Sequence, residues 1–188
     1  MMSEEDLRVR ASLAADGALF HGYHPSMRAV HDQHAARLAQ IIAEHGWPGE
    51  HRVAPEGAQA AWLIVQHAIA QPAFQRQALS ALKAAVGRGE APAWQAAMLE
   101  DRIRTFEGRP QRYGTQFDWD ATGQLNPLPI EDRAGVAERR RAVGLRPLEK
   151  EIEAQRRAVA QGGEHPPTDW EARQREMEAW LREVGWRT

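Results

Sequence analysis

Prolines and glycines divide most of this chain into short segments, and their positions are typical of helix ends. Proline is tolerated at the first position of a helix because the N–H that it lacks would have no partner there, and glycine often follows the last turn. Between these residues, apolar side chains recur at every third or fourth position, which is the helical period. The sequence predicts helices over about 3–16, 25–45, 55–70, 72–87, 92–106, 134–143, 147–161 and 168–184.

The helical period is lost over about 111–130. Aromatic residues at Tyr113, Phe117 and Trp119 are followed by a turn signal at 120–123, and this pattern predicts two short extended segments joined by a turn. The predicted fold is therefore mainly α, a single helical domain with a short β-hairpin insertion.

The segment 162–167 contains two glycines and two prolines and is the clearest linker in the chain. It separates a helical domain predicted over 1–161 from a C-terminal part over 162–188, which holds the linker and an amphipathic helix. Trp170 and Met177 lie on the apolar stripe of that helix. We expect the helix to pack on the helical domain or on a partner. The partner could be a second copy of the chain, which would give a homo-oligomer formed through this helix.

Two helix starts carry residues that commonly cap a helix. Thr168 followed by Glu171 matches the capping box, in which the first side chain accepts a hydrogen bond from the backbone N–H three residues later. Asp132 precedes the helix predicted from residue 134 and is expected to be an N-cap.

Composition and charge exclude several classes of protein. The absence of cysteine excludes a disulfide scaffold, a thiolate metal site and a cysteine nucleophile. The 24 basic and 26 acidic residues leave a net charge of −2, and we interpret the basic cluster at 139–141 as a solvated helix face, so no nucleic-acid partner is expected. No apolar run is long enough for a membrane span, and the acidic start is unlike a signal peptide. The sequence therefore predicts a cytoplasmic protein without a membrane partner.

Two ionisable side chains fall on predicted apolar helix faces. His67 shares a face with Leu63, and Asp101 shares one with Trp94. A buried carboxylate is costly unless it is paired, and a buried imidazole must satisfy both ring nitrogens. We therefore expect Asp101 to accept a hydrogen bond from His67 or His31. Such a pair is either a structural network in the core or the centre of a general base, and the residues alone leave both open.

The stretch that opens the predicted hairpin offers hydrogen-bonding side chains. In an extended strand Gln111, Tyr113 and Thr115 share one face and Gln116 lies on the other. Gly114 allows a close approach to the backbone or marks a bulge. These side chains are candidates for lining a small-ligand pocket, and the alternative is that the aromatic residues only pack the hairpin on the helices.

Histidine spacing raises the alternative of a metal site. His31 and His34 lie one helical turn apart, so with His67 they are candidate ligands of a divalent metal. His21 and His24 have the same spacing and are interpreted as loop residues. No His-Glu-x-x-His motif, glycine-rich nucleotide motif or nucleophile elbow is present, and no cofactor is predicted.

Several short strings, in order, resemble a widespread bacterial family that is catalogued only as a domain of unknown function. The resemblance covers about 22–148 and implies no activity. It does imply a shared site, because the polar residues singled out above fall in its motifs. The strings are Gly46-Trp47-Pro48, Gln66-His67-Ala68, Asp101-Arg102, Gly108-Arg109-Pro110-Gln111, Tyr113-Gly114-Thr115-Gln116, Pro129-Ile130-Glu131-Asp132, Arg139-Arg140 and Gly144-Leu145.

Together these observations favour a pocket that binds or acts on a small polar molecule. His67 is the candidate base with Asp101 orienting it, and the chemistry would be hydrolysis or proton transfer. A guanidinium matches a carboxylate in shape, so Arg102 indicates an anionic or carbonyl ligand. One alternative is a non-catalytic helical interaction module in which the polar network is structural, and the other is the histidine metal site. The candidate ligand-binding residues are His31, Gln66, Arg102, Gln111, Tyr113 and Gln116.

Overall fold

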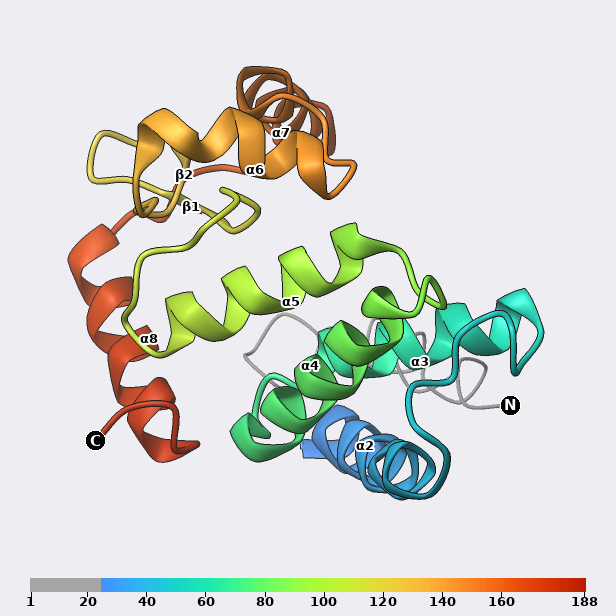
Figure 1. The fold of residues 1–188 in the computed structure, drawn as a ribbon. Helices are drawn as coiled ribbons and strands as arrows, with labels where there is room; N and C mark the ends of the chain where they lie inside the picture. Colours follow the sequence, from blue (N-terminus) through green and yellow to red (C-terminus); the bar gives the residue numbers. More distant parts are fainter. Residues whose placement is uncertain (1–24) are drawn as a thin grey trace. The chain divides into compact units, whose positions relative to one another are not determined.

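The computed structural model describes residues 25–188 (Figure 1). The helix predicted over about 3–16, His21 and His24 lie outside the described residues. By its internal contacts the chain divides into two compact units, Met1–Ala91 and Pro92–Thr188. The predicted mainly α fold with one hairpin and a C-terminal helix is confirmed within the described residues. None of the helices between residues 25 and 188 combines the length and apolar character that a membrane span requires.

Three helices form the described part of the first unit, and proline positions set where they start. They are α2 (Pro25–His45), α3 (Pro55–His67) and α4 (Pro72–Gly87). The first-turn prolines of α3 and α4 lie where a missing N–H has no cost. The helix α2 packs against both α3 and α4. The predicted bounds agree for α2 and α4, whereas α3 ends three residues earlier than predicted.

The buried face of α3 differs from the predicted one. Leu63 is 40% exposed, so its assignment to an inward face with His67 is wrong. Ala61, Val65 and Ala68 are buried instead. Trp62 and Ile64 are buried as well, so the buried face of α3 lies around Val65 and not around Leu63.

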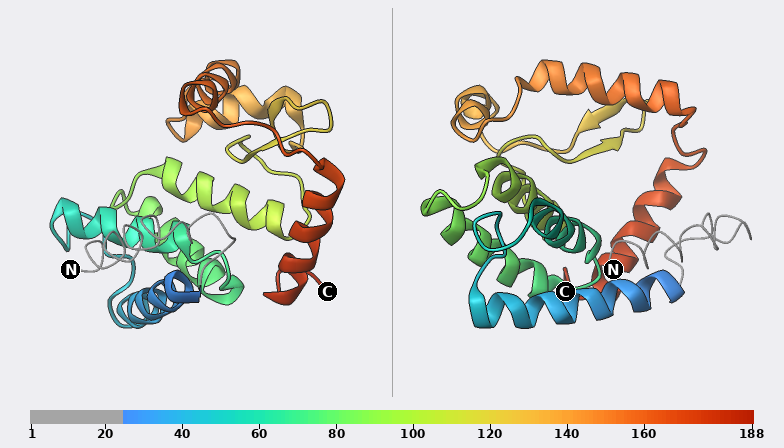
Figure 2. Two further views of the ribbon diagram at one scale, coloured as in Figure 1. Left: turned by 180° about the vertical axis from the view of Figure 1, so that it is seen from behind. Right: turned by 90° about the vertical axis from the view of Figure 1, so that its right-hand side faces the viewer.

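The second unit combines the remaining helices with the hairpin. The strands β1 (Phe117–Trp119) and β2 (Leu125–Pro127) pair antiparallel, with Asp118 opposite Asn126. The hairpin prediction is thus confirmed, with strands shorter than the predicted span. The helix α7 packs against β2, as the right-hand view of Figure 2 shows. The helical elements of this unit are α5 (Ala93–Phe106), η2 (Arg133–Gly135), α6 (Val136–Ala142), α7 (Leu148–Gly162) and α8 (Trp170–Glu183).

One of the two predicted caps is confirmed and the other is wrong. Asp132 caps η2, where its side chain accepts from the N–H of Gly135 at 3.3 Å. At α8 the cap is Asp169 and not Thr168, and its carboxylate accepts from the N–H of Ala172 at 2.7 Å. The shift by one residue places a carboxylate at the N-cap, where its negative charge interacts favourably with the positive end of the helix dipole.

Part of the apolar face of α8 is covered within its own unit. Leu181 and Trp186 are buried. The ring of Phe106 at the end of α5 meets Trp180 edge-on at 5.9 Å and Trp186 at 5.2 Å, measured between ring centroids. Arg187 then donates to the carbonyl of Phe106 at 2.9 Å. The predicted division of the chain between residues 161 and 162 stays a prediction.

The turn of the hairpin is organised by one carboxylate. Asp120 accepts from the N–H and hydroxyl of Thr122 at 2.8 and 2.6 Å. It also accepts from the N–H of Gln124 at 3.0 Å and from the side-chain amide of Asn126 at 2.7 Å. The Thr122 hydroxyl, with these other donors, lowers the pKa of Asp120 to about 2.

We expect an NMR titration of the side-chain carboxyl to give a pKa of about 2 for Asp120. The Asp side chain has a pKa of about 3.9 in an unfolded chain, so the folded-state pKa of Asp120 is depressed. The stabilising contribution of Asp120 is therefore present above about pH 4 and is lost as the pH falls toward 2. In Asp120→Asn this part of the pH dependence of unfolding should be absent, and an Asp120 pKa near 4 would contradict the assignment.

Candidate functional site

The backbone of the segment Gln111–Gln116, termed here the 111–116 loop, is held on one side by a buried carboxylate. Asp101 on α5 is fully buried, as predicted. Its Oδ1 accepts from the N–H of Arg112 at 2.7 Å and of Tyr113 at 3.1 Å. Its Oδ2 accepts from the N–H and the hydroxyl of Thr115, both at 3.0 Å. Burial raises the pKa of Asp101, and these donors oppose the rise.

Two arginines of α6 hold the carbonyl groups of the same loop. Arg140 is 1% exposed, and its Nη1 donates to the carbonyls of Tyr113 at 2.6 Å and Gly114 at 3.2 Å. Arg139 donates from Nε to the carbonyl of Arg112 at 2.9 Å. The interpretation of residues 139–141 as a solvated face is therefore wrong for these two arginines. The signal that was missed is spacing, since Arg140 lies four residues after Val136, which is buried.

A buried glutamine closes the loop on itself. The side-chain amide of Gln111 donates to the carbonyls of Gln116 at 3.0 Å and Leu128 at 2.7 Å. Its oxygen accepts from the N–H of Gln116 at 2.9 Å. Buried backbone groups must find partners, and here side chains supply what a helix or sheet would otherwise supply.

The charge of Asp101 sets the direction of a hydrogen-bond chain that ends at Gln116. An ionised carboxylate can only accept, so the Thr115 hydroxyl donates to it and must accept from the Gln116 amide nitrogen, at 3.1 Å. The Gln116 oxygen then faces Arg102, which donates from Nε at 3.3 Å. The second N–H of the Gln116 amide has no acceptor among the described residues.

Gln116 lines a pocket of about 560 Å³ in the second unit, termed here the α5–α8 pocket. Its walls come from the end of α5, the segments around the hairpin, and α8. Phe106, Phe117 and Met177 give it an apolar lining, and Arg187 adds a cation. Gln116 therefore stands at the point where the polar network of the 111–116 loop reaches an open cavity.

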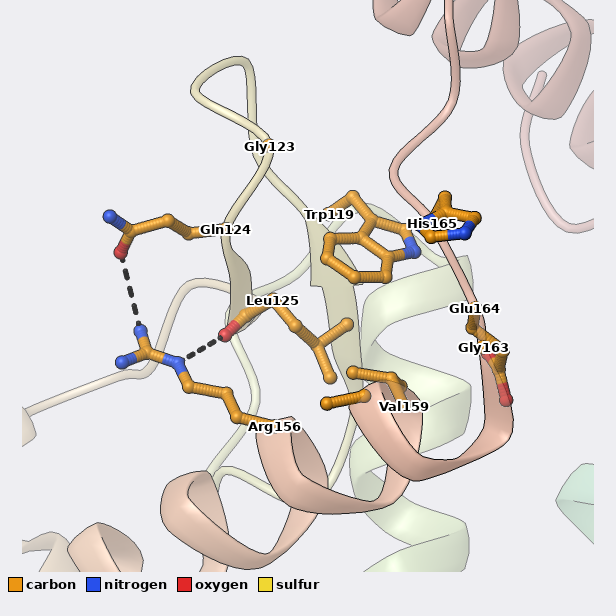
Figure 3. Close-up of a pocket in the computed structure, with 10 residues that line it drawn as sticks. Trp119, Gly123, Gln124, Leu125, Arg156, Val159, Gly163, Glu164 and His165 are labelled. Carbon is orange, nitrogen blue, oxygen red and sulfur yellow. Dashed lines mark hydrogen bonds between the residues drawn. The ribbon is translucent and has the colours of Figure 1, made fainter.

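A second pocket of about 550 Å³, termed the hairpin–α7 pocket, lies between the hairpin, the end of α7 and residues 163–165 (Figure 3). Trp119, Leu125 and Val159 give it apolar surface, whereas Glu164 and His165 give it polar surface. The sequence predicts that Gln116 lines a pocket but does not give the other walls of either pocket, because these depend on how segments distant in the sequence meet.

The structure brings part of the predicted site together. Asp101, Arg102, Gln111 and Gln116 belong to one hydrogen-bonded network. Tyr113 joins it through its backbone, while its ring lies under the guanidinium of Arg112 at 5.8 Å. Burial raises the pKa of the Tyr113 phenol, and the negative charge of Glu100 adds to this rise.

The remaining predicted residues lie in the first unit. The rings of His31 and His67 are 5.2 Å apart and tilted by 37°. Gln66 precedes His67 at the end of α3. Both oxygens of Asp101 accept hydrogen bonds from groups of its own unit. The pairing of Asp101 with His67 or His31, and the role of His67 as a base, stay predictions.

The metal-site alternative finds no support in residues 25–188, where no group of three or more His, Asp or Glu side chains is arranged to hold a metal ion. His34 is buried in the helix layer, at 6% exposure, while His31 faces His67. The two histidines thus have different surroundings, although they are one turn apart.

The fold and this network define a mainly helical protein with a polar loop clamped between a carboxylate and two guanidinium groups. The chain belongs to DUF6624, a family of unknown function whose model matches residues 2–161. No curated protein and no solved structure matches the chain significantly. The family match ends before α8, so one wall of the α5–α8 pocket comes from outside the matched region.

We expect Asp101→Asn to lower the free energy of unfolding by about 2–3 kcal/mol, because each buried donor left without an acceptor costs about 1–3 kcal/mol. An asparagine has one acceptor oxygen, and its NH₂ group would face backbone N–H groups. Urea unfolding measures the change. Asp169→Asn at the N-cap of α8 is the matched control, since asparagine is also a good N-cap, and it should stay within about 0.5 kcal/mol of the natural protein. Equal effects of the two substitutions would contradict the clamp.

Gly114 allows the close packing on which the loop depends. Its φ is +71°, and a Cβ there would lie 2.9 Å from Ile130 Cδ1 and from Leu148 Cδ1. Gly144 has a similar φ of +75° with open space around the Cβ position. The two glycines therefore share the conformational requirement but not the steric one.

We expect Gly144→Ala to cost about 1 kcal/mol, the cost of a left-handed conformation for a residue with a Cβ. Gly114→Ala should cost about 2–4 kcal/mol, since overpacking adds about 1–3 kcal/mol. Urea unfolding of both variants isolates the packing contribution as the difference between them. A difference near zero would show that the loop can move away from Ile130 and Leu148.

Proposed function

We propose that the chain binds a small molecule carrying a carboxylate or carbonyl oxygen in the α5–α8 pocket. One observation carries the proposal: Gln116 lines the pocket, and its amide is oriented so that one N–H is left for a ligand. Thr115 takes the other N–H, and Arg102 occupies the oxygen. A fixed donor at a cavity selects an acceptor oxygen, because its orientation is set before the ligand arrives.

The other groups of the pocket support a ligand with an apolar body. Phe117 and Met177 offer an aromatic ring and a flexible thioether, which suit a planar apolar group. Arg173 is held by Asp118 through two contacts at 2.6 and 2.7 Å. Arg187 is also engaged, by Glu178 and by backbone carbonyls. The guanidinium groups therefore supply a polar rim, and the oriented Gln116 amide supplies the specific contact.

The predicted reaction, hydrolysis or proton transfer with His67 and Asp101 as catalytic groups, stays a prediction, and the binding proposed here does not require it. The contacts of Asp101 support a positioning role, since the carboxylate orients the Gln116 amide through Thr115. Arg102, whose pKa is lowered by burial, has the same role from the opposite side.

The second candidate function is a non-catalytic interaction module. It is favoured by the same saturation of Asp101, which fits a structural network. A homo-oligomer through α8 would use what that helix leaves exposed, and Met177 is 37% exposed. Binding of small molecules in the α5–α8 pocket distinguishes the two functions, because only the first one requires it.

Ligand-observed NMR with phenylacetate, phenylacetamide and ethylbenzene tests the proposal. Ethylbenzene has a similar apolar body and no acceptor oxygen. We expect the two oxygen-bearing probes to bind and the hydrocarbon to bind weakly. Gln116→Leu should weaken both by roughly tenfold, because a hydrogen bond that contributes about 1.5 kcal/mol is lost. Gln161→Leu, an exposed glutamine on α7, is the control and should leave binding unchanged.

Two results would count against the binding proposal. Equal binding by the natural protein and a folded Gln116→Leu variant would remove Gln116 from the site. Failure of all three probes to bind would favour the interaction module.

A further inference from the structure

We infer that the hairpin–α7 pocket is a second binding site, for a small alkylated ammonium compound. It is separate from the α5–α8 pocket and does not depend on the function proposed there. The inference rests on three features of the pocket: an aromatic wall, a carboxylate that makes no hydrogen bond or ion pair within residues 25–188, and an arginine already held at the hairpin (Figure 3).

Trp119 supplies the aromatic wall, and its backbone is held on both sides. Its backbone pairs with Leu125 across the hairpin, and its carbonyl accepts from the indole N–H of Trp170 at 2.9 Å. The face of an indole is the best of the aromatic surfaces for attracting a cation. An indole carried on this held backbone at the wall of a cavity therefore favours a positively charged ligand.

Glu164 supplies negative charge at the same pocket. Its backbone N–H donates to the carbonyl of Val159 at 2.9 Å, which fixes the residue just after the end of α7. Its carboxylate makes no hydrogen bond or ion pair with any residue of the described part of the chain. The C-terminal end of a helix also carries partial negative charge, so α7 adds to the attraction for a cation.

The one arginine of the pocket is committed to the hairpin. Arg156 donates from Nε to the carbonyl of Leu125 at 3.0 Å and from Nη2 to the side chain of Asn126 at 2.7 Å. In Figure 3 its guanidinium group reaches toward Gln124 and the Leu125 carbonyl, whereas Trp119 and His165 lie on the other side of the Leu125 side chain. The end of the pocket near Trp119 is thus left to a cation from solution.

The apolar lining selects among cations. Leu125, which is 8% exposed, and Val159 lie beside the indole. Methyl groups on a ligand nitrogen would contact this surface and gain free energy from apolar burial. A bare ammonium ion would lose its hydration without this gain. The pocket therefore fits an alkylated ammonium group better than an inorganic cation.

Choline and its neutral isostere 3,3-dimethyl-1-butanol are the probes, and the readout is the indole N–H resonance of Trp119 in the full chain. Trp119→Phe assigns that resonance. The titration is made at pH 8, where histidine is ordinarily neutral. We expect choline to shift the Trp119 resonance and the neutral alcohol to bind at least fivefold more weakly, roughly the effect of a cation on an aromatic face.

Two carboxylate variants complete the test. Glu164→Gln should weaken choline binding roughly threefold to tenfold and leave the neutral alcohol unchanged, as expected for loss of one partly screened charge. Glu153→Gln on α7, where the carboxylate pairs with Lys150 at 3.1 Å, is the matched control and should bind choline like the natural protein. Equal binding of the two probes, an unmoved Trp119 resonance, or choline binding that ignores Glu164→Gln would each overturn the inference.

Discussion

The carboxylate of Asp101 is the group on which the second unit depends. The 111–116 loop belongs to no helix, and only Gln111 makes an isolated bridge, so most of its backbone groups need partners from elsewhere. Asp101 accepts hydrogen bonds from N–H groups of the loop, while Arg139 and Arg140 donate to carbonyl groups of the loop. Removing either side would leave buried polar groups without partners, which costs more than the hydrogen bonds themselves contribute.

The same carboxylate links folding to the candidate function. Because it only accepts, it sets the direction of the Thr115 hydroxyl and through it the orientation of the Gln116 amide. A group that stabilises the loop therefore also prepares the donor at the α5–α8 pocket. The structural and functional interpretations of the polar residues are thus compatible for Asp101, because the proposed function requires it only to orient Gln116 and not to contact a ligand.

Much of the helical framework could be predicted, because it depends on local chemistry. Proline at a first turn and the helical spacing of apolar residues act within a few residues, so the bounds of α2 and α4 agree with prediction. Burial of Asp101 could also be predicted from its helical face. Its partners could not, since periodicity shows that a side chain points inward without showing what it meets. Leu63 is a further example, because two neighbouring faces of α3 have the same spacing and only packing selects between them.

The sequence by itself determined the helices, the position of the hairpin and the set of polar residues that must find partners. These properties follow from backbone conformation and from the cost of burying charge, both of which are local. The tertiary structure alone decided that Asp101 holds a loop more than ten residues further along, that Arg140 is buried, and that two pockets border the hairpin. Those properties depend on contacts between segments far apart in the chain, and no local rule specifies such contacts.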